Sequence, residues 1–257
     1  MMEPATDLSP NTPATKRQPK RGIYLLPNLF TTAALFAGFY AILASIDGNY
    51  QQAVIAVFLA FILDGLDGRV ARLTQTQTTF GAEYDSLSDL IAFGLAPSLM
   101  MYQWAFADLG KIGWFVAFIY TATTALRLAR FNTAQSEDKK YFTGLPSPSA
   151  AAILAATVWV VLDTGYQGTF LVWPMAIVTV LVGLLMVSNI RYYSFKEIDF
   201  KGKVPFISAV IIVLGFAVLL TKPAPVLFIL FITYGLSGPA MALYRLRRRK
   251  QRQAIRR

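Results

Sequence analysis

Carboxylate side chains gather in one short stretch of this 257-residue chain. Of the 14 acidic residues, five fall between positions 64 and 89, namely Asp64, Asp67, Glu83, Asp85 and Asp89. Asp64 and Asp67 are three residues apart, so they share one face of a helix. Asp85 and Asp89 are four apart and share a face in the same way. Two such pairs on facing helices could enclose two divalent cations, and oxygen ligands favour Mg²⁺ or Mn²⁺ over Zn²⁺.

Two residue types that commonly do chemistry are missing from the sequence. The chain has no Cys, which excludes disulfides, thiolate metal ligands and a thiol nucleophile. It also has no His, which removes the commonest general base and any Ser-His-Asp arrangement. Acid–base chemistry is therefore left to carboxylates, Lys or Tyr.

Small and cationic residues accompany the carboxylates. Gly68 and Ala71 leave their part of the helix without bulk, so a flat base or a pyrophosphate could approach the backbone closely. Arg72 adds a fixed positive charge suited to phosphate, and Gly81 precedes the second carboxylate pair. The alternative interpretation is that the Asp residues only cap helices and neutralise Arg69 and Arg72.

The elements that must position these residues are membrane helices. A hydrophobic content of 55% with only 15% charged residues is unusual for a soluble protein. Carboxylates at membrane depth are expensive and usually persist when paired, metal-bound or functional. Apolar runs of about 17 to 25 residues, long enough to span a bilayer, recur along the chain. We predict an all-α, polytopic bundle of about eight transmembrane helices at 25–46, 50–68, 86–106, 112–130, 147–163, 170–188, 205–221 and 224–244.

The basic residues predict the topology. Placing both termini in the cytoplasm (N-in/C-in) puts 22 of the 24 Lys and Arg residues inside and leaves only Lys111 and Lys222 outside. This split also supports an even number of spans. Basic flanks of this kind orient a protein and contact anionic lipid headgroups, so the net charge of +10 does not indicate a nucleic-acid partner.

Composition divides the chain into three parts. Residues 1–22 are rich in Pro and charge and predict a disordered cytoplasmic tail. Residues 23–246 form the membrane domain, and 247–257 form a basic cytoplasmic tail. The first apolar run is as long as a span, so we interpret it as an uncleaved anchor rather than a signal peptide.

The spacing Asp64-x2-Asp67-Gly68-x2-Ala71-Arg72-x8-Gly81-x3-Asp85-x3-Asp89 closely resembles the signature of the CDP-alcohol phosphotransferases. The resemblance implies a divalent-metal site held by Asp64, Asp67 and Asp85, with Asp89 as the general base and as a further contact to the metals. It also implies that Gly68, Ala71, Arg72 and Gly81, together with the three metal-binding Asp residues, border the CDP moiety, and that the protein is a homodimer.

Three further stretches, 26–31, 125–132 and 142–148, resemble the bacterial phosphatidylserine synthases of this family. Within the second, Arg127 and Arg130 are three residues apart and could present two guanidiniums to one anion, while Asn132 adds a neutral hydrogen-bonding group. The carboxylate of serine or the lipid phosphate would suit them. The alternative is that both Arg residues only anchor the end of a membrane helix.

The expected activity is transfer of a phosphatidyl group from CDP-diacylglycerol to L-serine in the bacterial inner membrane, with the active site facing the cytoplasm. Serine is the preferred acceptor, and glycerol 3-phosphate or inositol phosphate are the alternatives within the family. A cation-coupled transporter is an alternative of another class, but it predicts carboxylates near the bilayer midplane and broken helices. An inert membrane scaffold is the third, and the complete motif argues against it.

Overall fold

The computed structural model describes residues 25–133, 141–166, 168–193 and 206–254. The tail predicted for residues 1–22 lies outside this part of the chain. The described elements are α1 (Leu25–Ile46), α2 (Tyr50–Thr74), α3 (Thr79–Asp89), η2 (Leu90–Leu95), α4 (Ala96–Met101), η3 (Tyr102–Phe106), η4 (Ala107–Leu109), α5 (Lys111–Thr133), β1 (Tyr141–Thr143), α6 (Ser147–Asp163), η5 (Gly168–Leu171), α7 (Val172–Val187), β2 (Arg191–Tyr193), α8 (Phe206–Thr221) and α9 (Pro223–Ala254).

Every apolar run that the sequence predicted falls on a helix, so the all-α prediction is confirmed at that level. Within the described residues, four segments are long and apolar enough to cross a membrane, and α6 and α7 are shorter apolar helices. The four are Pro27–Ile46, Thr79–Leu109, Lys111–Thr133 and Pro223–Arg245. Helix α2 continues beyond its predicted end at residue 68 to Thr74, and α9 continues to Ala254, so the predicted basic tail begins as helix.

The third predicted span differs most from expectation. It begins at Thr79 rather than at residue 86 and contains two π-helical segments, η2 and η3. In η2, the carbonyl oxygen of Phe93 accepts a hydrogen bond of 3.0 Å from the Tyr120 hydroxyl of α5. A side chain that bonds into the backbone ladder in this way is a recognised cause of local irregularity. The irregular turns follow immediately after Asp89.

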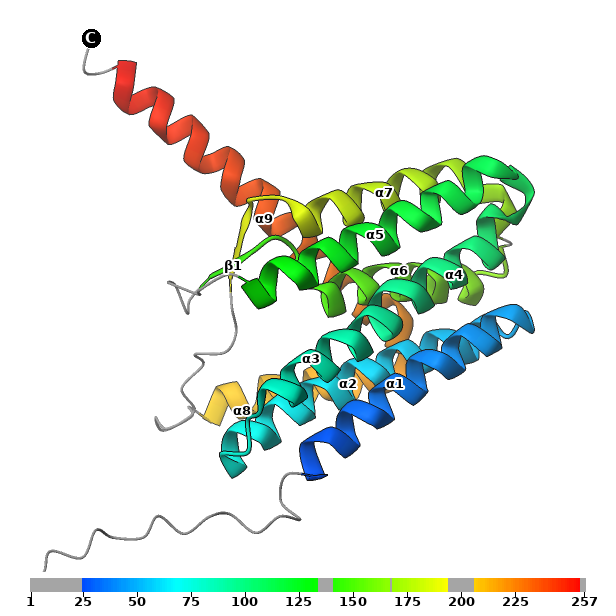
Figure 1. Cartoon of the computed structure of the whole chain (residues 1–257). Coiled ribbons are helices and arrows are strands. Elements are labelled where there is room, and N and C mark those ends of the chain that lie inside the picture. The colour runs from blue at the N-terminus through cyan, green and yellow to red at the C-terminus, as the bar shows by residue number, and fades with distance from the viewer. Residues whose placement is uncertain (1–24, 134–140, 167, 194–205, 255–257) are drawn as a thin grey trace, which may run out of the picture.

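Small residues let the helices approach closely. Helices α1 and α2, α5 and α7, and α6 and α9 are the most extensive neighbours, and Figure 1 shows α1, α2 and α3 side by side. All side chains from Ala150 to Val158 of α6 are buried. A Cβ added to Gly38 would lie 2.6 Å from the Cα of Ala92, so only glycine permits this contact between α1 and η2. Close packing through small residues is typical of membrane helices.

A two-stranded antiparallel sheet joins the loops that follow α5 and α7. Phe142 of β1 lies opposite Tyr192 of β2. Figure 1 places β1, the turn between α2 and α3, and the C-terminal half of α9 at the same end of the bundle. The predicted carboxylate cluster lies toward this end.

Candidate active site

Helices α2 and α3 bring three carboxylates together. Asp64 and Asp67 come from α2 and Asp85 from α3, and one oxygen from each lies within 4.8 Å of the others. Three convergent carboxylate oxygens are a suitable donor set for a hard divalent cation and unsuitable for a soft one. The residues therefore fit the metal that the sequence predicted at this place.

Helix α1 supports the cluster from behind. The Thr31 hydroxyl lies 2.8 Å from Oδ2 of the buried Asp67, to which it donates a hydrogen bond. The backbone oxygen of Thr31 accepts in turn from the Ser88 hydroxyl at 3.1 Å, so α1 also fixes α3. The sequence stretch 26–31 ends at Thr31, but this role was not predicted. The available signal was a polar side chain within a strongly apolar helix.

Asp89 lies next to Asp64 but is not a member of the group whose oxygens all lie within 4.8 Å of one another. It is the last residue of α3, where the π-helical segment begins. Its carboxylate hydrogen-bonds with that of Asp64 and is close enough to Asp85 and Arg127 for their charges to interact. The four predicted Asp residues are therefore brought together, and Asp89 lies within electrostatic range of the Arg127 guanidinium.

The small residues border open space. A Cβ added to Gly68 would meet no atom within 4 Å, so the helix is bare beside Asp67. Ala71 is half-buried one turn further, and Arg72 is exposed in the last turn of α2. Gly81 lies in the first turn of α3, where its N–H donates to the Thr78 hydroxyl at 3.0 Å. Room is thus left on the α2 side of the carboxylates.

Arg127 is buried and firmly held. Its Nε donates to the backbone oxygen of Leu145 at 2.8 Å, and its Nη1 donates to the Ser147 hydroxyl at 2.9 Å. Neither bond uses Nη2. The guanidinium is within electrostatic range of Asp89 and Asp64, so this residue belongs to the site.

Arg130 and Asn132 do not join Arg127. Arg130 donates to the backbone oxygen of Val187 at 3.3 Å and to the Asn189 side chain at 2.7 Å, at the end of α7. The two guanidiniums thus bond to different segments of the chain, and their sharing of one anion stays a prediction. The neighbouring segments give each guanidinium its own partners: Leu145 and Ser147 for Arg127, and Val187 and Asn189 for Arg130.

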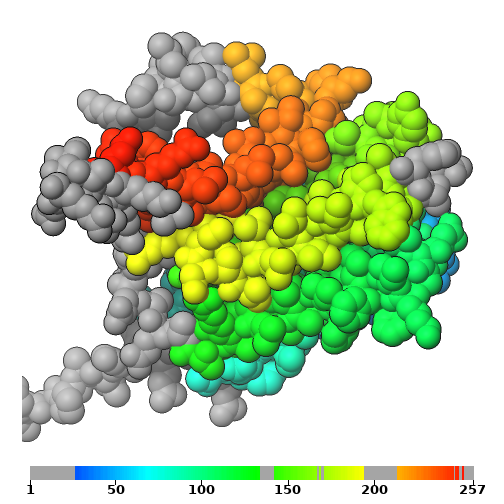
Figure 2. All heavy atoms as spheres, turned by 90° about the horizontal axis from the view of Figure 1, so that it is seen from above, coloured from blue at the N-terminus to red at the C-terminus, as the bar shows by residue number. Residues whose placement is uncertain are grey.

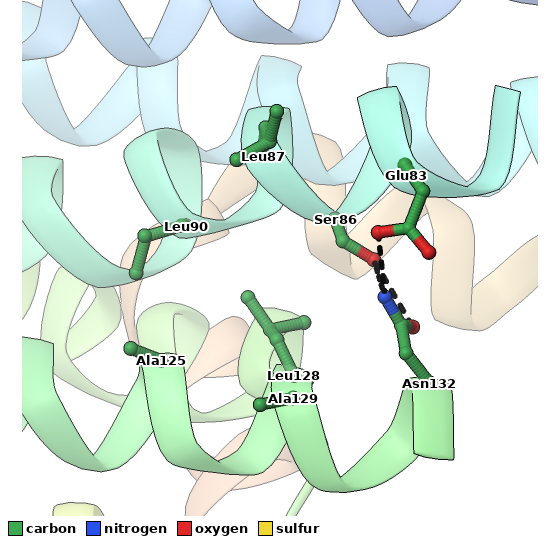
Figure 3. A pocket seen from close by; sticks show the side chains of 8 residues that line it. All are labelled: Glu83, Ser86, Leu87, Leu90, Ala125, Leu128, Ala129 and Asn132. Atoms are coloured by element: carbon green, nitrogen blue, oxygen red, sulfur yellow. Dashed lines mark hydrogen bonds between the residues drawn. The ribbon is translucent and has the colours of Figure 1, made fainter. Parts of the chain in front are cut away.

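Asn132 instead links α5 to α3. Its amide nitrogen lies 3.0 Å from the Ser86 hydroxyl and 3.5 Å from a carboxylate oxygen of Glu83, as Figure 3 shows. These three side chains form the polar mouth of a groove of about 190 Å³. Its other lining side chains are apolar: Leu87, Leu90, Ala125, Leu128 and Ala129. The groove is a separate feature from the carboxylate cluster.

Fold and site together define a membrane-helix protein with an acidic centre whose carboxylates fit a divalent cation. Residues 24–185 match the CDP-alcohol phosphatidyltransferase family. The match covers more than half of the chain, and the chain belongs to this family.

Similarity to individual proteins extends further along the chain. A CDP-diacylglycerol–serine O-phosphatidyltransferase of Helicobacter pylori is 38% identical over 225 residues, which cover 85% of this chain and 92% of that protein. An archaetidylserine synthase of Methanothermobacter thermautotrophicus is 37% identical over 169 residues, covering 65% of this chain and 69% of that protein. A CDP-diacylglycerol–serine O-phosphatidyltransferase of Methanocaldococcus jannaschii is 35% identical over 172 residues, which cover 67% of this chain and 75% of that protein.

Proposed function

We propose that this protein transfers the phosphatidyl group of CDP-diacylglycerol to L-serine, giving phosphatidylserine and CMP. The observation that carries the proposal is the meeting of four Asp side chains with Arg127 at one place in a membrane-helix bundle. The names of the similar proteins, which act on CDP-diacylglycerol and serine, support the same substrates.

The donor lies on the α2 side of the site in this proposal. Gly68 and Ala71 leave space there, and Gly81 and Arg72 lie on either side of the turn between α2 and α3. The CDP moiety binds over these small residues, with its pyrophosphate toward the three carboxylates, which would hold a divalent cation, Mg²⁺ or Mn²⁺. Asp64, Asp67 and Asp85 hold this cation, which, when bound, neutralises negative charge on the pyrophosphate and on the departing CMP.

Asp89 acts as the general base. It accepts the proton of the serine hydroxyl as the serine oxygen forms a bond to the phosphorus that carries the lipid. The bond between this phosphorus and the CMP oxygen breaks, and CMP leaves with the bonding electrons. A direct in-line displacement suits a chain without Cys or His, because no covalent intermediate is required.

Arg127 binds the serine carboxylate. Its Nε and Nη1 are held by Leu145 and Ser147, while Nη2 makes neither of these bonds and the guanidinium lies near Asp89. Serine bound between Asp89 and Arg127 would place its hydroxyl toward the Asp89 carboxylate and its own carboxylate toward the Arg127 guanidinium. Charge-assisted hydrogen bonds to a carboxylate are among the stronger ones that a protein makes.

The proposal includes eight membrane spans with both termini in the cytoplasm of a bacterial cell and the site facing that side. The distribution of Lys and Arg supports it, since 22 of the 24 then lie inside. The domain boundaries predicted at residues 23 and 246 and a homodimer, implied by the resemblance to the family, belong to the same proposal.

The test is a CMP-release assay with purified protein, CDP-diacylglycerol and Mg²⁺ or Mn²⁺. L-serine, glycerol 3-phosphate and inositol phosphate are supplied separately, and the lipid product is identified by mass. We expect CMP release and phosphatidylserine formation with serine. Turnover with a phosphorylated alcohol and none with serine would overturn the choice of acceptor, and no turnover with any alcohol would overturn the enzyme assignment.

A further inference from the structure

The C-terminal part of the chain lies outside the family region and yet reaches the site. The family match ends at residue 185, before β2, α8 and α9 begin. Similarity to the Helicobacter pylori serine transferase extends over 225 residues, which is more than the 162 residues from 24 to 185. Features that bear on the acceptor are therefore to be sought in this C-terminal part.

Tyr192 fastens β2 to α9. Its ring is fully buried, and its hydroxyl donates to the backbone oxygen of Gly235 at 3.0 Å. A Cβ added to Gly238 would collide with the ring, so α9 approaches β2 as closely as glycine allows. Burial raises the pKa of Tyr192 to about 12, so the phenol stays protonated and keeps its donor. Figure 2 shows α9, coloured orange to red, along the yellow segment that ends in β2.

Tyr234 adds a second contact from α9. Its hydroxyl donates to the backbone oxygen of Tyr193 at 3.3 Å, and its ring centroid lies 5.7 Å from that of Tyr192. The phenol is also within electrostatic range of the Arg127 guanidinium. The two tyrosines, Tyr192 from β2 and Tyr234 from α9, thus join the strand to the helix, and the Tyr234 phenol lies within electrostatic range of Arg127.

The sheet connects α9 to the segment that binds Arg127. β2 pairs with β1, and beyond the sheet the Gly144 N–H donates to the oxygen of Ile190 at 2.8 Å. The next residue, Leu145, donates its N–H to Leu185 at 3.0 Å and accepts from Nε of Arg127 at 2.8 Å. A continuous series of hydrogen bonds and one strand pair therefore joins α9 to the guanidinium.

We propose that Tyr192 and Tyr234 are positioning residues that set the place of the Arg127 guanidinium and thereby the selection of an acceptor alcohol that carries a carboxylate. The inference rests on the proposed function, in which Arg127 binds that carboxylate. It assigns to α9 a role in acceptor recognition that acts through the position of Arg127.

The test uses the full-length protein with Tyr192→Phe and Tyr234→Phe, which keep the rings and remove the hydroxyls. Tyr244→Phe is the matched control, because Tyr244 is exposed on α9, the helix that carries Tyr234. We expect the KM for serine to rise about fivefold in each of the first two variants, as for loss of one neutral hydrogen bond. The KM for CDP-diacylglycerol and the thermal shift induced by CDP stay within about twofold of the wild type, as both do in the control.

A double-mutant cycle shows whether the effect passes through Arg127. In an Arg127→Lys background the Tyr234→Phe substitution should add less than about twofold to the KM for serine, because the positioned group is gone. Three results would overturn the inference: equal effects in both backgrounds, a joint rise of the KM for serine and the KM for CDP-diacylglycerol, or no change in either KM. Wild-type turnover with serine would still uphold the proposed function in each of these cases. Absence of wild-type turnover with serine would overturn the proposed function itself.

Discussion

Asp89 occupies a position unlike that of the other three carboxylates. It lies outside the group formed by Asp64, Asp67 and Asp85, and it contacts Asp64 on one side while Arg127 lies within range. A carboxylate beside the three clustered Asp residues and near the Arg127 guanidinium is placed to accept a proton from a bound acceptor. The structure thus places Asp89 next to Asp64, one of the proposed ligands, but outside the group of three carboxylates.

Substituting Asn for Asp89 should remove the base and keep the shape. We expect kcat to fall by a factor of about 10² to 10⁴, because a positioned base contributes about that much. Glu83→Gln is the control, since Glu83 is an exposed carboxylate on the same helix. Turnover is measured by CMP release and donor binding by the thermal shift with CDP. Equal losses in the two variants, or unchanged turnover in Asp89→Asn, would remove Asp89 from this role.

Thr31 orients Asp67, so its effect should appear in the metal dependence. Thr31→Val removes the hydroxyl that donates to Asp67 at 2.8 Å and nearly keeps the volume. We expect the metal concentration for half-maximal activity to rise about 10- to 100-fold, as for other groups that support metal ligands. In Thr32→Val, the control, the lost hydroxyl bonds to Asn28 and Tyr84 instead. The role of Thr31 is rejected if both variants titrate like the wild type.

At the residue scale, sequence predicts what is local. The spacing of Asp64 with Asp67, and of Asp85 with Asp89, is a property of single helices, so their convergence was predictable once two helices faced each other. The bond between Thr31 and Asp67 spans 36 residues and depends on how α1 packs, which spacing does not reveal. The distinct partners of Arg127 and Arg130 depend in the same way on segments that fold back from later in the chain.

At the element scale, the short sheet depends on a glycine at the end of β1. Gly144 follows β1 with φ of +79°, a conformation that favours glycine. Its N–H bonds to Ile190, and an added Cβ would collide with the backbone oxygen of Met186. The strand pair therefore requires glycine here for two separate reasons, backbone conformation and close contact.

Gly144→Ala should destabilise the protein more than a substitution that affects conformation alone. Gly165 has φ of +76° and no atom within 4 Å of an added Cβ, so Gly165→Ala is the matched control. We expect the control to lower the free energy of unfolding by about 1 kcal/mol and Gly144→Ala by about 2 to 4 kcal/mol. Unfolding is followed in detergent with denaturant. Similar losses in both variants would contradict the close contact with Met186.

Helix type and approximate bounds could be predicted from apolar length, whereas the π-helical segments could not. An apolar run from residue 86 to 106 fits a regular helix equally well. The first irregular segment, η2, carries contacts with other helices: Tyr120 of α5 bonds to Phe93, and Gly38 of α1 lies against Ala92. The two strands were not predicted either, because segments of three residues carry too little pattern.

At the scale of the whole molecule, the absence of Cys makes the topology directly testable. Each introduced Cys is unique in the chain. We expect a membrane-impermeant maleimide to label Asp47→Cys, in the turn between α1 and α2, on intact bacterial cells. Gln77→Cys, in the turn between α2 and α3, should be labelled only after permeabilisation. Both positions are exposed in the structure, so access to the side chain is not limiting. The reverse pattern would contradict the N-in topology.

The order of the elements along the chain has a consequence for how the acceptor could change during evolution. The carboxylates come from α2 and α3, which precede the exposed turn at Gly110, whereas Arg127 and the segments that hold it follow that turn. In the proposed function, donor chemistry is thus encoded in the first part of the gene and acceptor recognition in the second. A recombination point between them would exchange one alcohol for another and leave the chemistry of phosphatidyl transfer intact.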